Sequence, residues 1–113
     1  MKVLAIDNRR NNRNTNANHT SRTFEDGVNK LKTEKWDLLY LDYDLGKYKK
    51  SGYDVMQFIK ENKEFAPKMI MSISPEPSCE DRINGMIKDV YGRVFDSRDV
   101  NSLKESENKP ERI

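Results

Sequence analysis

A chain of 113 residues is long enough for one domain with a single core and too short for two. Its 21 Lys and Arg residues nearly balance 19 Asp and Glu residues, so the net charge of +2 gives no support to a nucleic acid as partner. No apolar run approaches the roughly 18 residues that span a bilayer, and no signal-peptide pattern is present, so we expect a cytoplasmic protein without a membrane partner.

The first part of the chain predicts two strands separated by a loop and a helix. Residues 2–6 form an apolar run that is too short for a helix and predicts a buried strand. The asparagine-rich stretch 8–22 predicts a long exposed loop with a rudimentary strand near its end. Thr23 has an acidic residue three positions further on, the spacing of a capping box, and predicts the start of a helix. Residues 36–41 predict a strand covered by helices on both faces.

The second part predicts two helices and two strands. A capping box at Ser51 predicts the second helix, and residues 68–73 predict the next buried strand. Prolines in the stretch 75–77 predict a rigid turn. A third capping box, at Ser78, predicts the third helix, and residues 91–95 are short enough to predict a last edge strand.

The alternation of strands and helices predicts an α/β fold with a parallel sheet and right-handed crossovers. We expect one domain over residues 1–103, followed by a polar, disordered tail over residues 104–113. The mean hydropathy of -0.99 agrees with a small core that carries polar appendages.

Polar side chains follow three of the predicted strands: Asp7, then Asp42 with Asp44, and then Ser72 with Ser74. Ligands of parallel sheets bind beyond the carboxyl ends of the strands, so these residues should share one crevice. Clustered carboxylates repel one another unless a cation joins them, and Mg²⁺ is the usual cation for two carboxylates plus waters. The pattern thus predicts a metal site at the three aspartates, while a structural role in the turn that follows stays open.

The other polar groups near this crevice have two interpretations each. Hydroxyls that end a strand and brace the following turn are favoured over phosphoryl sensors for Ser72 and Ser74. Arg10 belongs to an arginine-rich loop that could bind phosphates, although a solvated loop is favoured. The lysine-rich stretch 47–50 borders the crevice and could form part of a partner surface. Cys79 is favoured as a packing or surface residue over a catalytic one.

Five short stretches occur in an order that is characteristic of one family. They are 7–10 (Asp-Asn-Arg-Arg), 22–23 (Arg-Thr), 41–46 (Leu-Asp-Tyr-Asp-Leu-Gly), 51–55 (Ser-Gly-Tyr-Asp-Val) and 71–75 (Met-Ser-Ile-Ser-Pro). Together they resemble the cyclic-phosphate-processing receiver domains, a family with the fold of two-component receivers. The resemblance covers residues 2 to about 90 and implies a small flavodoxin-like, receiver-like domain of three layers.

The resemblance also implies roles by position. Asp42 stands where receivers carry the phosphoryl-accepting carboxylate, and Asp7 stands where they carry a ligand of Mg²⁺. Ser72 lies near the position of the hydroxyl that senses the phosphoryl group. Asp42 is therefore the candidate for a chemically active residue.

The chain also departs from the family pattern. Asn8 replaces an acid, Tyr43 and Met71 replace histidines, and Ser74 replaces an asparagine. The strand at 68–73 has no lysine at its end or just after it, where ordinary receivers keep one. Tyrosine and methionine do not titrate near neutrality as histidine does, so the active site is interpreted as degenerate.

These departures predict a non-catalytic, receiver-like regulatory module that binds another protein, and they favour a role other than that of an enzyme. The small chain, rich in Asn and Lys, suggests a phage or mobile-element origin and a host protein as target. Two alternatives stay open. One is a phosphoryl-accepting switch that depends on Mg²⁺, and the other is a cyclic-phosphate-processing enzyme.

Overall fold

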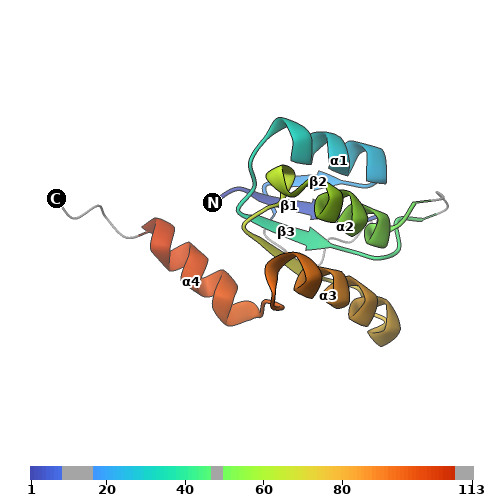
Figure 1. The fold of residues 1–113 in the computed structure, drawn as a ribbon. Coiled ribbons are helices and arrows are strands. Elements are labelled where there is room, and N and C mark those ends of the chain that lie inside the picture. The colour runs from blue at the N-terminus through green and yellow to red at the C-terminus, as the bar shows by residue number, and fades with distance from the viewer. Residues whose placement is uncertain (9–16, 47–49, 109–113) are drawn as a thin grey trace.

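Four parallel strands form the sheet: β1 (Val3–Ile6), β2 (His19–Ser21), β3 (Leu38–Leu41) and β4 (Met69–Ser72). Their order in space is β2-β1-β3-β4, which places β1 and β3 at the centre (Figure 1). These are the first four strands of the flavodoxin-like order. The computed structural model describes residues 1–8, 17–46 and 50–108, and over them it confirms the predicted parallel α/β sheet.

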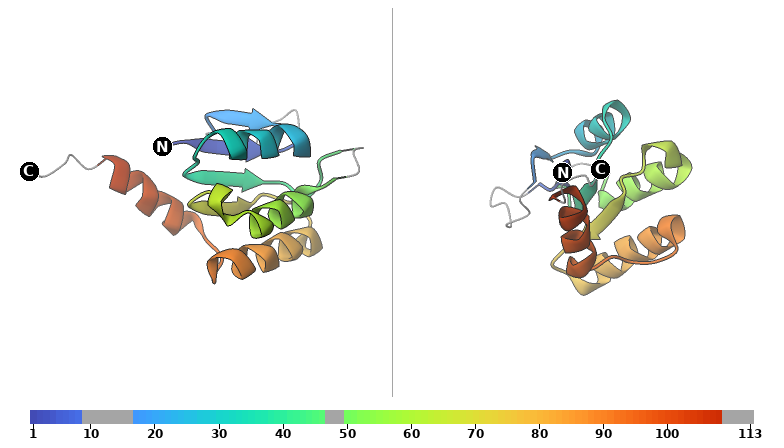
Figure 2. Two further views of the ribbon diagram at one scale, coloured as in Figure 1. Left: turned by 45° about the horizontal axis from the view of Figure 1, so that its top comes forward. Right: turned by 90° about the vertical axis from the view of Figure 1, so that its left-hand side faces the viewer.

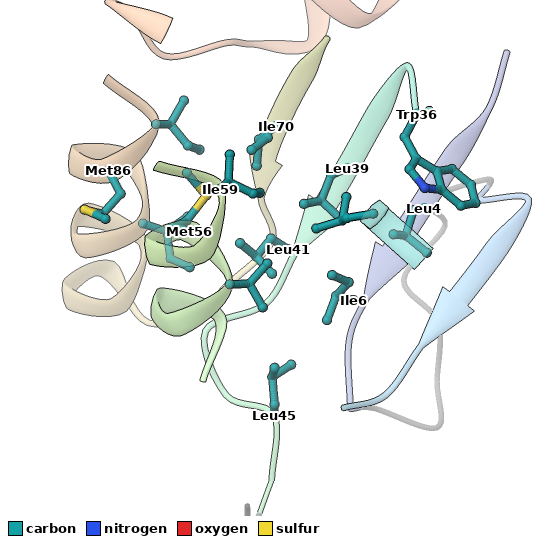
Figure 3. Packing of buried hydrophobic residues seen from close by; sticks show 14 residues of the cluster. Leu4, Ile6, Trp36, Leu39, Leu41, Leu45, Met56, Ile59, Ile70 and Met86 are labelled. Carbon is teal, nitrogen blue, oxygen red and sulfur yellow. The ribbon is translucent and has the colours of Figure 1, made fainter. Parts of the chain in front are cut away.

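Three helices cover one face of this sheet: α1 (Phe24–Thr33), α2 (Gly52–Glu61) and α3 (Pro77–Tyr91) (Figure 2). The strands alternate, so that Leu4, Leu39 and Ile70 point to these helices and form the main core with them (Figure 3). A short 3₁₀ turn, η1 (Lys63–Phe65), follows α2.

Two of the predicted helix starts have the expected caps. The Thr23 hydroxyl accepts the backbone N–H of Asp26 at 3.1 Å at the start of α1. Ser51 caps α2, where its hydroxyl accepts the N–H of Tyr53 and its own N–H donates to the Asp54 carboxylate at 2.7 Å. These local hydrogen bonds confirm the two capping residues.

The third helix begins differently from the prediction. Its cap residue is Glu76, with Pro77 in the first turn, and no side-chain hydrogen bond caps it among the described residues. The capping box at Ser78 was therefore a wrong prediction. Proline suits the first turn of a helix because its missing N–H would have no helical partner there, and this preference overrides the capping spacing.

The edge strand predicted at residues 91–95 is also wrong. Helix α3 continues through Tyr91 and ends at Gly92, whose φ of 78° closes the helix with a left-handed residue. The Tyr91 hydroxyl donates to the carbonyl of Pro67, and its ring lies 5.3 Å from that of Phe95. These contacts partly bury Tyr91 and Phe95 without a ladder of strand hydrogen bonds, while Val94 between them stays 46% exposed.

A fourth helix, α4 (Ser97–Asn108), lies on the other face of the sheet and projects from it (Figures 1 and 2). Its Val100 is buried against Val3 and Leu38. The tail that we expected to be disordered from residue 104 is helical as far as Asn108, and the expected domain boundary falls inside α4. None of the described helices is long and apolar enough to cross a membrane.

Candidate functional site

The strand order brings the predicted aspartates to one edge of the sheet. Asp7 follows β1 and Asp42 follows β3, and the Asp42 N–H donates to the carbonyl of Ile6 at 3.0 Å. The two residues therefore lie side by side at the carboxyl ends of neighbouring strands. Both are buried, with 2% of Asp7 and 1% of Asp42 exposed. Their burial agrees with the predicted crevice at this edge.

A pocket of about 360 Å³ opens beside Asp42. Its walls come from three places: the loop after β3, the residues at the start of α2, and the segment that joins β4 to α3. The polar residues in its lining are Asp42, Asp44, Lys50, Ser51, Ser74, Glu76 and Cys79.

The predicted residues divide between the pocket and its surroundings. Asp42, Asp44 and Ser74 line it, whereas Asp7 and Ser72 are not part of the described lining. Arg10 lies outside the described residues. Cys79 lines the pocket from the first turn of α3, and its thiol lies 3.8 Å from the Glu76 carboxylate.

The carboxylates of the β3 loop hold the loop's own backbone. The Asp44 N–H donates to Asp42 Oδ1 at 3.3 Å, and the Gly46 N–H donates to Asp44 Oδ1 at 2.8 Å. Such contacts two residues apart form Asx turns. Gly46 has a φ of 89°, and Leu45 anchors the loop in the core (Figure 3). The structural interpretation of the two aspartates as turn-forming residues therefore has direct support.

The hydroxyl of Ser74 fixes this loop to the next strand. Ser74 is 7% exposed, and its Oγ accepts the backbone N–H of Tyr43 at 2.9 Å. Its own N–H lies 3.4 Å from the hydroxyl of Ser72. The two hydroxyls brace the strand end, as the favoured interpretation of the sequence expected.

The start of α2 packs directly on the same loop. The Gly52 N–H donates to the carbonyl of Tyr43 at 2.8 Å. A Cβ atom at Gly52 would meet the carbonyl oxygen of Asp42 and would lie 3.0 Å from the Cα of Tyr43. The glycine that follows the Ser51 cap is therefore required by the close approach of two backbones.

Arg82 of α3 is a neighbour of the pocket that the sequence did not indicate. Its Nη1 donates to the Tyr43 hydroxyl at 3.0 Å. Its guanidinium carbon lies 5.7 Å from the centre of the Tyr43 ring and 5.4 Å from the centre of the Tyr53 ring. No local pattern marks this arginine, because only the packing of α3 beside α2 brings it to the two rings.

Lys50 and His19 are two basic residues that could take part in chemistry at the pocket, and they lie in different places. Lys50 lines the pocket, and its ammonium lies 4.5 Å from the centre of the Phe24 ring. The only histidine, His19, stands at the start of β2, where its ring packs edge-on against Trp36 at 5.2 Å. Because Trp36 precedes β3, this histidine lies at the opposite edge of the sheet from the pocket.

Two of the three predicted metal ligands, Asp7 and Asp42, follow adjacent strands. Within residues 1–8, 17–46 and 50–108, no three His, Cys, Asp or Glu side chains are grouped so that they could hold a metal ion. Asp44 is exposed and bonds the Gly46 N–H, while Asp7 and Asp42 sit on adjacent strand ends. Two carboxylates plus waters are a usual Mg²⁺ ligand set, so binding at this pair stays a prediction.

Comparison with known proteins agrees with this architecture. A family model described as "Cyclic-phosphate processing Receiver domain" matches residues 1–89. A solved structure, described as amino acids 181–211 of the yeast Spc42 trimeric coiled coil fused to another structure, is similar with a TM-score of 0.62 and 16% identity. The similarity covers 93% of this chain and 74% of that one, and at such identity it shows the fold alone. No curated protein matches the chain.

Proposed function

Because the chain belongs to the cyclic-phosphate processing receiver domain family, we propose that it is a regulatory module that acts by binding another protein and not by catalysis. One observation carries this proposal: polar side chains at the strand ends accept hydrogen bonds from the backbone of the β3 loop. Asp42, Asp44 and Ser74 each accept a backbone N–H of the β3 loop. Groups used in this way preserve the shape of the scaffold.

The proposal is also supported by the residues that stand at the pocket. Proton transfer at neutral pH needs a group that titrates in that range, most often histidine. The only histidine packs against Trp36 at the other edge of the sheet. Tyr43, which follows Asp42, is engaged through its hydroxyl with Arg82. A receiver fold in which Tyr43 and Met71 replace histidines still has a surface that can bind another protein.

Affinity capture with two matched baits tests this function. The wild-type chain and the Asp42→Asn variant are tagged and exposed to extract of the cell in which the chain occurs, which the proposal takes to be a phage host. Asparagine keeps an oxygen that can accept the Asp44 N–H, so the loop should be preserved. We expect both baits to recover the same stoichiometric protein. Recovery of none by either bait would overturn the proposal.

A second candidate function is a phosphoryl switch at Asp42, because this residue ends a central strand and lines a pocket. Asp7 and Asp42 would hold Mg²⁺, which would neutralise negative charge as the phosphoryl group approaches. The chain's own contribution would be the acceptor carboxylate and the Ser74 hydroxyl, which lines the same pocket.

Intact-mass measurement tests the switch. Wild-type protein and Asp42→Asn are incubated with a small acyl phosphate and Mg²⁺. A phosphoryl switch requires a mass gain in the wild type that is missing from the variant. Equal masses before and after incubation would exclude it. Loss of the captured partner in Asp42→Asn alone would favour the switch over the non-catalytic module.

A further inference from the structure

The guanidinium of Arg82 contacts two aromatic rings that belong to different elements. Tyr43 comes from the loop after β3, Tyr53 from the first turn of α2, and Arg82 from α3. Distances of 5.7 Å and 5.4 Å to the ring centres are within the range of cation–π contacts. The hydrogen bond to the Tyr43 hydroxyl, at 3.0 Å, adds a third contact. We call these three residues the Arg82 clamp.

The clamp joins the three elements that form the walls of the pocket. The β3 loop supplies Tyr43 to the lining, the cap residue of α2 supplies Ser51, and α3 supplies Cys79 one turn before Arg82. The Tyr43 backbone is fixed on both sides, by Ser74 through its N–H and by Gly52 through its carbonyl. Tyr43 thus both lines the pocket and contacts Arg82.

The clamp has an intermediate strength. Arg82 is exposed, and two cation–π contacts at an exposed site correspond to a preference of about 5-fold to 30-fold for the closed arrangement. Such a ratio keeps the clamp closed in the free chain. It is also small enough for the binding of another molecule to reverse it.

We propose that Arg82 is a positioning residue that holds Tyr43 at the wall of the pocket and carries the pocket's occupancy to the outer surface of α3. An occupant that turns the Tyr43 ring removes two of the three contacts and releases the guanidinium. The outer surface of α3 then changes its charge pattern. This inference rests on the proposed function, since it gives the protein-binding module a means of regulation.

Amide hydrogen exchange measured by NMR tests the clamp in the isolated chain. Arg82→Gln should accelerate exchange of the Tyr43 and Gly52 amides by about 5-fold to 30-fold, the preference that the two cation–π contacts supply. The Leu38 and Met69 amides, bonded at the opposite edge of the sheet, should keep their rates. Arg82→Lys should restore part of the protection, because a lysine retains the charge without the planar fork.

A matched control is Arg98→Gln on α4, where the arginine side chain is 91% exposed. It should leave the Tyr43 and Gly52 amides unchanged. If Arg82→Gln accelerates all amides by one factor, or accelerates neither of the two pocket amides, Arg82 has no positioning role.

The coupling to occupancy is tested by filling the pocket. Cys79 is the single cysteine and lines the pocket, so N-ethylmaleimide places one group there. Alkylation should accelerate exchange of the Tyr43 and Gly52 amides in the wild type and shift the Arg82 side-chain N–H resonance. It should add little in Arg82→Gln, since the clamp is already open. Equal acceleration in both proteins would overturn the coupling.

The Cys79→Ser variant treated with N-ethylmaleimide is the control for modification at other residues. Its amide exchange rates should equal those of the untreated variant. These measurements use the chain without a partner. Failure of the capture experiment would therefore leave them intact, and failure of the clamp would leave the capture result intact.

Discussion

Replacement of Gly52 by alanine tests how tightly α2 packs on the candidate site. The added Cβ would meet the Asp42 carbonyl oxygen and lie 2.9 Å from its carbonyl carbon, whereas ordinary contacts are 3.4–4 Å. All of these atoms are backbone, so no side-chain rotation relieves the overlap. The loop must separate from α2 and lengthen the hydrogen bond from Gly52 to Tyr43, now 2.8 Å.

The magnitude follows from these contacts. Overpacking of a close-packed site costs about 1 to 3 kcal/mol, and a weakened backbone hydrogen bond adds about 1 kcal/mol. Alanine regains about 0.5 to 1 kcal/mol through its lower entropy in the unfolded chain. We expect Gly52→Ala to lower the free energy of unfolding by about 2 kcal/mol, or the urea midpoint by about 1 M.

Urea unfolding is followed by the fluorescence of Trp36, the single tryptophan, which is 3% exposed. Gly85→Ala is the matched control, because its added Cβ would have no described atom within 4 Å apart from its chain neighbours and the backbone of α3 itself, and α3 continues on both sides. It should raise stability by about 0.5 to 1 kcal/mol. An unchanged or higher midpoint for Gly52→Ala would refute the close approach of α2 to the Asp42 loop.

Three further predictions concern pH, capping and catalysis. Burial alone would raise the pKa of Asp37, but the Lys2 backbone N–H at 2.7 Å and the Lys68 ammonium at 3.0 Å lower it below 3.8. The ionised Asp37 therefore contributes to the free energy of unfolding above pH 3.8, and this contribution is lost as pH falls through the folded pKa. Asp37→Asn should flatten this dependence of stability on acid pH, measured by urea unfolding. Ser51→Ala should lower the free energy of unfolding by about 1 kcal/mol, whereas Ser78→Ala should change it by no more than about 0.5 kcal/mol, because of these two serines only Ser51 caps a helix. Cyclic phosphates should not be turned over. If turnover is found and persists unchanged in Asp42→Ala with Asp44→Ala, it does not belong to this pocket.

The strands, the acids that follow them and two helix caps could be predicted, because each depends on residues that are close in the sequence. The short apolar runs marked β1, β3 and β4, because buried strands of a parallel sheet are covered on both faces. The acids that follow β1 and β3 could be placed at one edge because parallel strands share their direction. The caps at Thr23 and Ser51 were also predictable, since each involves backbone groups at most three residues away.

Where a local signal competes with packing, the prediction failed. The spacing at Ser78 was the same as at Ser51, yet Pro77 starts α3. The apolar residues of 91–95 suited a strand, but the Tyr91 hydroxyl reaches Pro67 and its ring packs on Phe95. The polar composition after residue 103 suggested disorder, although the sequence continues a helix that Val100 anchors.

The sequence by itself determined the alternation of strands and helices, the family resemblance and the edge at which Asp7 and Asp42 meet. Only the tertiary structure decided how the pocket is built, because its walls come from three segments that are distant in the chain. Arg82 and Tyr43 are separated by 39 positions and meet at 3.0 Å. Hydrophobic periodicity reports which face of an element is buried, but it does not specify which polar side chains of two packed elements will touch.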